Sequence, residues 1–147
     1  MKKKLCFILI FTVLLINGCG SQTKMKDGFY TAEMSDYSHG WKEYICIMVK
    51  DGKIVSAEFN AKNQSGYIKA WDNSYMKNMY AVTGTYPNEY TRYYTAELLK
   101  QQDDSGVDAL SGASHSGGNF NKLAAAVIEQ AIKGNSETIW VETEAEE

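Results

Sequence analysis

Small, hydroxyl-bearing and glycine residues are concentrated in residues 108–118, which read Asp-Ala-Leu-Ser-Gly-Ala-Ser-His-Ser-Gly-Gly. The segment leads into residues 119–133, where apolar residues recur with helical spacing. The first N–H groups of a helix lack intrahelical partners, and the helix dipole is positive there, so this junction favours an anion. By themselves, the residues are compatible with a phosphate site or with an ordinary solvated loop that caps a helix.

The first seven residues of this segment resemble the flavinylation motif of FMN-binding domain proteins. In that motif Asp is followed by two variable residues, Ser or Thr, Gly, Ala and a final Thr or Ser. The resemblance implies that a flavin transferase, using FAD and a divalent metal, esterifies FMN to the hydroxyl of Ser114 and releases AMP. It also implies that Asp108 is recognised by the transferase, and that Ser111, Gly112 and Ala113 allow the nucleotide to approach closely.

Two features depart from the family pattern. The acceptor position is commonly threonine and here is Ser114, which supplies a hydroxyl that can attack phosphorus in the same way. Gly117 and Gly118 stand where the family often has hydroxyl residues. Tightly bound but non-covalent FMN, and a domain that keeps the fold without flavin, therefore remain as alternatives.

The resemblance extends over most of the chain and points to the small, membrane-anchored lipoprotein branch of the family. It implies an extracytoplasmic electron carrier that exchanges electrons with redox partner proteins or external acceptors. Its opening strands, middle helices and closing helix are matched by Asp27, Gly28, Tyr30, Gly40, Trp41, Val49, Asp51, Gly52, Lys53, Ile54, Lys69, Asp72, Tyr75, Met79, Gly84, Pro87, Tyr90, Phe120 and Leu123.

The N-terminal segment has the features of a lipoprotein signal peptide. Three lysines precede an uncharged, largely apolar run over residues 5–16, which is shorter than the ~20 residues needed to cross a bilayer. Leu15-Ile16-Asn17-Gly18-Cys19 resembles a lipobox, which implies cleavage after residue 18 and a lipid on Cys19. The predicted location is the extracytoplasmic face of the cell membrane. The alternatives are an ordinary secretory signal with a chance cysteine, or a precursor whose cleaved apolar run is a peptide signal.

Composition excludes several classes of protein. The 147 residues carry a net charge of −3, so no basic excess indicates a nucleic-acid partner. With 44% apolar and 22% charged residues, the chain has the composition of a folded domain. Two histidines, and a single cysteine (Cys46) after Cys19, predict no metal site and no internal disulfide. A flavin-dependent enzyme with its own small substrate is a further alternative to an electron carrier, but we find no dedicated acid–base pair in its favour.

The pattern of apolar residues predicts an α+β fold, in which a twisted antiparallel sheet packs against helices. We expect a tether over residues 19–26, an FMN-binding domain over 27–141 and an acidic tail over 142–147. The expected strands are 29–34, 41–49, 54–60 and 139–141, the expected helices are 70–82, 89–102 and 119–133, and a long loop is expected over 103–118.

A flavin ring needs flat apolar surface, for which Trp41, Trp71, Tyr67 and Tyr75 are the candidates. His115 lies beside the expected acceptor and is a candidate phosphate contact. The same aromatic residues fit a second hypothesis, a surface lipoprotein that binds a non-flavin ligand or acts in adhesion.

Overall fold

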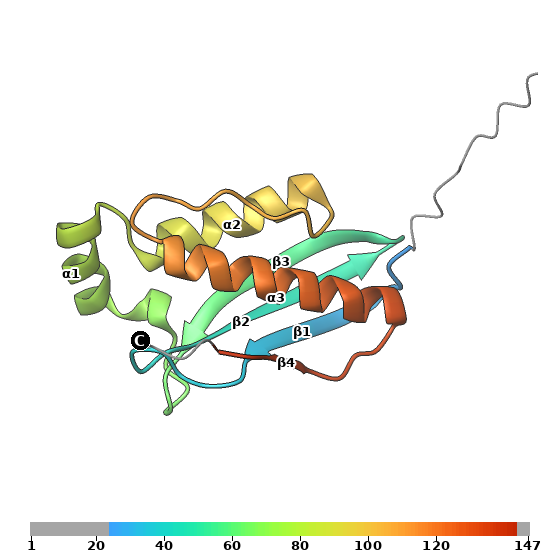
Figure 1. Cartoon of the computed structure of the whole chain (residues 1–147), viewed down its shortest axis with the longest axis horizontal. Coiled ribbons are helices and arrows are strands. Elements are labelled where there is room, and N and C mark those ends of the chain that lie inside the picture. Colours follow the sequence, from blue (N-terminus) through green and yellow to red (C-terminus); the bar gives the residue numbers. More distant parts are fainter. Residues whose placement is uncertain (1–23, 144–147) are drawn as a thin grey trace, which may run out of the picture.

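The computed structural model describes residues 24–143 and shows an α+β fold, as the sequence predicts (Figure 1). A four-stranded sheet packs against helices α2 and α3, while α1 lies at one end of the molecule. The elements are β1 (Gly28–Met34), β2 (Lys42–Lys50), β3 (Lys53–Lys62), the 3-10 turn η1 (Lys69–Trp71), α1 (Asn73–Thr83), α2 (Pro87–Gln101), α3 (Ser114–Lys133) and β4 (Ile139–Val141).

The sheet has the strand order β3-β2-β1-β4. The predicted hairpin joins β2 to β3, with Asp51 and Gly52 both at positive φ, as a tight hairpin turn requires. The expectation of an antiparallel sheet is wrong at one edge, because β4 pairs parallel with β1. The chain returns along α3 to the end of the sheet where β1 begins, so β4 must run in the same direction as β1 (Figure 1).

The core lies between one face of the sheet and helices α2 and α3. Alternate residues of β2, including Ile45, Ile47 and Val49, are buried, which is the period-2 pattern of a half-covered strand. The predicted apolar stripe on α3 is confirmed at six positions, since Phe120, Leu123, Ala124, Val127, Ile128 and Ala131 are buried, and its last residue, Ile132, is partly buried. Cys46, which alternation directs to the opposite face, is only partly buried.

All three helices differ from the prediction at their boundaries, and α2 begins at Pro87 rather than at residue 89. α3 begins at Ser114 rather than at residue 119, so the end of the expected loop is helical. Glycine disfavours helix, but Gly117 is buried and packs against Tyr94, so tertiary packing overrides propensity. The expected helix over 70–82 is divided at Asp72, whose carboxylate caps α1 by accepting a hydrogen bond from the Tyr75 N–H at 2.9 Å.

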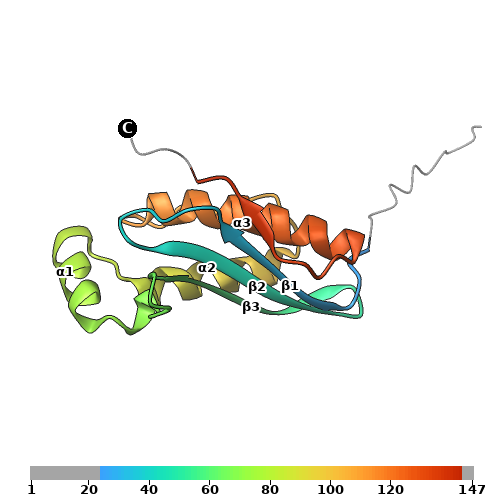
Figure 2. The ribbon, with the colours of Figure 1, turned by 90° about the horizontal axis from the view of Figure 1, so that it is seen from below.

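The domain has two distinct ends. At one end, the Lys26 N–H donates to the Ala131 carbonyl at 2.8 Å, which attaches the entering chain to the C-terminal part of α3. At the other end lie the N-terminus of α3 and helix α1, in both views of the molecule (Figures 1 and 2). A helix of 20 residues is about 30 Å long, so this length separates Ser114 from the entry of the chain.

Several predicted segments lie wholly or partly outside the described residues. These are the signal peptide over 1–18, Cys19 with the tether up to residue 23, and residues 144–147 of the tail. Within the described part, Met25 is buried in the core although we expected it in the tether. Thr143 of the expected tail accepts a hydrogen bond from the Asp36 N–H at 2.9 Å.

Candidate functional site

A cavity of about 280 Å³ lies beside the N-terminus of α3. This volume is just below the range for small-molecule sites, which is roughly 300–1,000 Å³. The walls come from the ends of β1 and β2, the loop between these strands, η1, α1, the start of α3 and the C-terminal segment. The lining residues are Met34, Asp36, Ser38, His39, Trp41, Glu43, Lys69, Tyr75, Met79, Gly112, Ala113, His115, Ser116, Asn119 and Thr143.

Ser114, the expected flavin acceptor, is the exposed first residue of α3. It lies between Ala113 and His115, which both line the cavity. The N-cap of the helix is Ala113, which has no side chain that could bond the free N–H groups of the first turn. An anion esterified to Ser114 would therefore meet unoccupied donors and the positive end of the helix dipole.

Gly112 is the tightest position of the motif. Its φ is +81°, and a Cβ atom there would lie 2.7 Å from the carbonyl oxygen of Thr83. The motif loop thus packs directly against the connection between α1 and α2. Glycine at this position is required by the fold itself, in addition to any close approach of a nucleotide.

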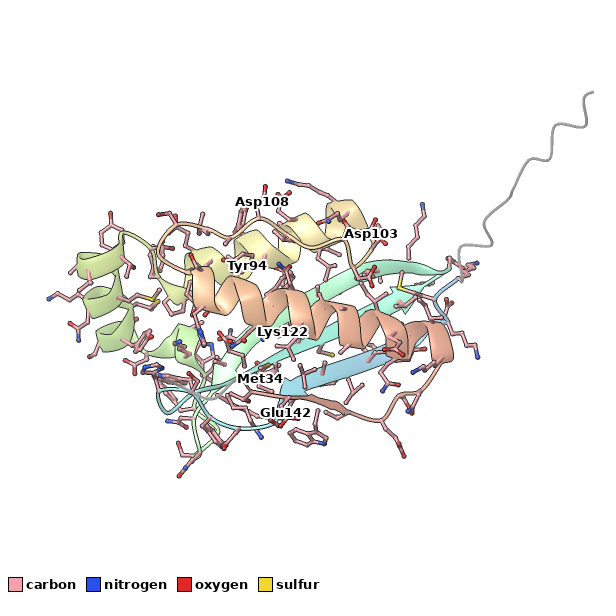
Figure 3. The ribbon with its side chains drawn as sticks, in the orientation of Figure 1. Met34, Tyr94, Asp103, Asp108, Lys122 and Glu142 are labelled. Atoms are coloured by element: carbon pink, nitrogen blue, oxygen red, sulfur yellow. The ribbon has the colours of Figure 1, made fainter. Side chains whose placement is uncertain are left out.

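Tyr94 holds the motif loop against α2. Its hydroxyl donates to the Ala113 carbonyl and accepts from the Leu110 N–H, both at 3.0 Å. The ring stacks on Phe120, with centroids 5.2 Å apart, and Figure 3 shows it between α2 and α3. Burial raises the pKa of the Tyr94 hydroxyl, which therefore stays protonated and can bridge the two backbone groups.

Asp108 and Ser111, the other motif residues, are exposed and are not among the cavity-lining residues. Figure 3 shows Asp108 on the loop that runs over α2. The structure therefore divides the motif into two parts. Gly112 and Ala113 form cavity wall beside Ser114, whereas Asp108 and Ser111 are available to an approaching protein.

The four aromatic candidates are divided in the same way. Trp41 and Tyr75 line the cavity and meet edge to face, with ring centroids 5.8 Å apart and planes at 72°. Tyr67 and Trp71 lie outside it, and Trp71 is 65% exposed. Only the first pair can form a wall of this cavity.

Polar residues that the sequence analysis did not single out as site residues complete the cavity. Glu43 is buried on β2 and accepts a hydrogen bond from the Asn119 amide at 2.7 Å. The same amide nitrogen lies 3.3 Å from Nε2 of His115, the residue after Ser114. A carboxylate at an inward-facing position of a strand is a signal that could have indicated Glu43. Burial, and then the Glu43 carboxylate, raise the pKa of Tyr90.

Among the described residues that line the cavity, Lys69 is the only lysine. It is 9% exposed, and its Nζ lies 4.7 Å from the ring centroid of Tyr75 and 5.9 Å from that of Trp41. In the sequence, Lys69 stands out only as one position of the family resemblance. The chemical role of a lysine is not visible in the sequence until its burial is known.

The cavity has what a flavin needs: aromatic surface, a buried cation and, beside it, a hydroxyl at a helix N-terminus. The residues present therefore fit FMN. In residues 24–143, no group of three or more His, Cys, Asp and Glu side chains is arranged to hold a metal. The helices in this part of the chain are also too short or too polar to cross a membrane.

Comparison with known proteins places the chain among bacterial relatives. No protein-family model matches it. A crystal structure of the CPE2226 protein from Clostridium perfringens is similar over 82% of this chain and 99% of that one, with a TM-score of 0.78 and 35% identity. A solution structure from Clostridium thermocellum is similar over 78% and 95%, with a TM-score of 0.51 and 30% identity.

One curated protein extends the similarity to nearly the whole chain. The 15 kDa lipoprotein of Treponema pallidum (strain Nichols) is 31% identical over 140 residues, which are 95% of this chain and 98% of that protein. Only about 5% of this chain lies outside the match, which is fewer residues than the 18 of the predicted signal peptide. The matched region therefore includes part of that peptide. The chain therefore belongs to the family of this 15 kDa lipoprotein.

Proposed function

We propose that this protein is a lipid-anchored flavoprotein that carries one FMN, esterified through its phosphate to Ser114, and acts as an extracytoplasmic electron carrier. The observation that carries the proposal is the position of Ser114. It is an exposed hydroxyl at the start of α3, flanked by two residues that line a cavity with aromatic walls. The flavin would supply the redox chemistry, and the protein its position and surroundings.

The two ends of the domain support a carrier that faces away from the membrane. The chain enters beside the C-terminal end of α3, about 30 Å from Ser114 along the helix. The proposed lipid site, Cys19, is five residues before Lys24, a span of at most roughly 17 Å. In an upright domain, the flavin would therefore be presented to partner proteins or acceptors outside the membrane.

An ester bond suits this compartment. A dissociable cofactor outside the cell is lost by dilution, whereas an esterified one is retained. The exposed Asp108 and Ser111 would provide the surface that the flavin transferase recognises during maturation. Ser114 would act as a nucleophile once, when its oxygen attacks phosphorus and AMP leaves.

The test is an intact mass after denaturation of the full chain co-expressed with a flavin transferase. We expect a mass increase equal to one FMN ester in the parent protein and in Ser114→Thr, which keeps a hydroxyl. We expect none in Ser114→Ala. A mass increase that persists in Ser114→Ala would show that FMN is attached to another residue, which would contradict the role of Ser114. A folded parent protein without any increase would contradict the covalent proposal.

A second candidate function rests on a different surface. Tyr67, Trp71, Tyr80 and Val82 are exposed on and just before α1, and Val82 is 85% exposed. A non-flavin lipoprotein could use this surface to bind a carbohydrate or cell-wall ligand. It would be colourless and folded in the same co-expression, and Trp71→Ala would weaken its binding to isolated cell-wall polysaccharide.

A further inference from the structure

Lys69 is a buried cation without an anionic partner. Its side chain is in contact with the rings of Trp41 and Tyr75. Within residues 24–143, no carboxylate lies within 4.0 Å of its Nζ, and the side chain makes no hydrogen bond. Burying an ammonium group is costly unless it is paired, and two ring faces compensate only part of that cost.

Two other lysines show how the fold normally treats such a group. Lys42 lies over the rings of Tyr37 and Trp140, and Lys62 lies over Tyr44. Both also pair with Glu33, at 3.7 and 2.6 Å. Lys69 has the aromatic contacts without the carboxylate. A hydrogen-bond acceptor bound in the cavity that Lys69 lines would supply the missing partner.

Two acidic residues of the described part of the chain line the cavity, Asp36 and Glu43, and neither is ion-paired with Lys69. A hydrogen bond to another residue already engages Glu43, because its carboxylate accepts the amide N–H of Asn119 at 2.7 Å. The same cavity is thus lined by a hydrogen-bond donor, Lys69, and by a hydrogen-bond acceptor, Glu43. The polar edge of an isoalloxazine ring offers the complement, since it carries two carbonyl oxygens on either side of an N–H.

Resting on the proposed function, we infer that Lys69 recognises the carbonyl edge of the flavin ring rather than the phosphate. The phosphate would stay at the start of α3, because Ser114, which would carry it, is exposed and is not a cavity-lining residue, whereas its neighbours Ala113 and His115 are. The cavity of about 280 Å³ is small for a whole mononucleotide, and suits a ring whose phosphate remains at the helix terminus.

The experiment compares FMN with riboflavin, which has the ring but no phosphate. The full-length Ser114→Ala protein, purified flavin-free in detergent, is titrated with each ligand while flavin fluorescence is followed. Adding Lys69→Met should weaken both ligands by the same factor, at least tenfold. The matched control is Lys62→Met, which removes a lysine with an aromatic contact outside the cavity and should change neither affinity by more than twofold.

Each outcome of this titration decides between two roles. If Lys69→Met weakens FMN but not riboflavin, Lys69 binds phosphate and the inference is overturned. Equal affinities with and without Lys69 also overturn it. Thermal unfolding of flavin-free Lys69→Met checks the fold: loss of an unpaired buried charge should leave the melting temperature unchanged or higher, whereas a purely structural lysine would lower it.

Failure of the inference is distinguishable from failure of the proposed function. If the parent protein gains the FMN mass but flavin-free Ser114→Ala binds neither ligand, the ester is confirmed and the ring-binding role of Lys69 is contradicted. If the parent gains no mass while Ser114→Ala binds riboflavin and Lys69→Met weakens that binding, the ester is contradicted. The role of Lys69 is then supported for a flavin that is bound without a covalent bond.

Discussion

The hydroxyl of Tyr94 donates a hydrogen bond to the carbonyl oxygen of Ala113 at 3.0 Å, which fixes the residue before Ser114 to helix α2. The same hydroxyl accepts from the Leu110 N–H. One buried side chain thus holds the motif segment, residues 108–114, at two points. A Cβ on Gly117 would lie 2.5 Å from this hydroxyl, so glycine at this position makes room for it.

Tyr94→Phe should therefore destabilise the protein. Two backbone groups lose their partner, and an unsatisfied buried polar group costs roughly 1–3 kcal/mol. The measurement is chemical denaturation of the variant beside Tyr93→Phe, whose half-buried hydroxyl has no hydrogen bond within residues 24–143. That control should stay within about 0.5 kcal/mol of the parent. Equal stability of the two variants would contradict the role assigned to Tyr94.

Two glycines at the site should respond to alanine in opposite directions. Gly112→Ala combines a positive φ with a contact of 2.7 Å to the Thr83 carbonyl, so it should cost about 1–3 kcal/mol. A Cβ on Gly118 meets no atom within 4 Å, and the residue lies in α3, so Gly118→Ala should stabilise by roughly 0.5–1 kcal/mol. Denaturant midpoints of both variants test the pair, and a stabilising Gly112→Ala would refute the packing described.

Helix α1 should open more readily than the rest of the domain. None of its 11 residues is buried, although Tyr75 and Met79 line the cavity, whereas ten residues of α3 are buried. Local opening is easiest where few side chains are held by the core. Hydrogen exchange followed by mass spectrometry should show α1 amides exchanging well before those of α3. Equal protection of the two helices would show that α1 is held by contacts beyond those of the described residues.

Alkaline pH should destabilise the fold through Tyr90. Burial raises the pKa of this hydroxyl above its value in the unfolded chain, which is about 10. Above that pH, the unfolded state binds fewer protons than the folded state, so stability falls as pH rises. The contribution is fully present below pH ~10 and is lost as the pH approaches the folded-state pKa.

Melting temperatures of the parent and of Tyr90→Phe between neutral pH and pH ~11 measure this effect. The variant should lose less stability over the alkaline part of the range, since it has no phenol at this position to ionise. Tyr94, whose pKa is also raised, would account for part of the slope that remains. If the melting temperatures of the two proteins fell in parallel as the pH rose, a group other than Tyr90 would be responsible for the loss of stability.

The sequence by itself determined the local elements. The stripe from Phe120 to Ala131, the Asp51-Gly52 hairpin and the alternation in β2 depend on periodicity and turn chemistry, which neighbouring residues specify. The motif around Ser114 was also visible from residue order, although its chemistry remains a proposal. The lipoprotein character indicated by Cys19 and the preceding residues agrees with the name of the relative from Treponema pallidum.

Tertiary structure alone decided where α3 begins, the parallel pairing of β4 and which residues meet at the cavity. Residues 114–118 have poor helix propensity, and only packing against Tyr94 shows why they are helical. Glu43 of β2, Lys69 of η1 and His115 of α3 come from different elements, so no spacing in the chain links them. The burial of Lys69 depends on long-range contacts, and that burial is what turns an ordinary lysine into a candidate ligand-binding residue.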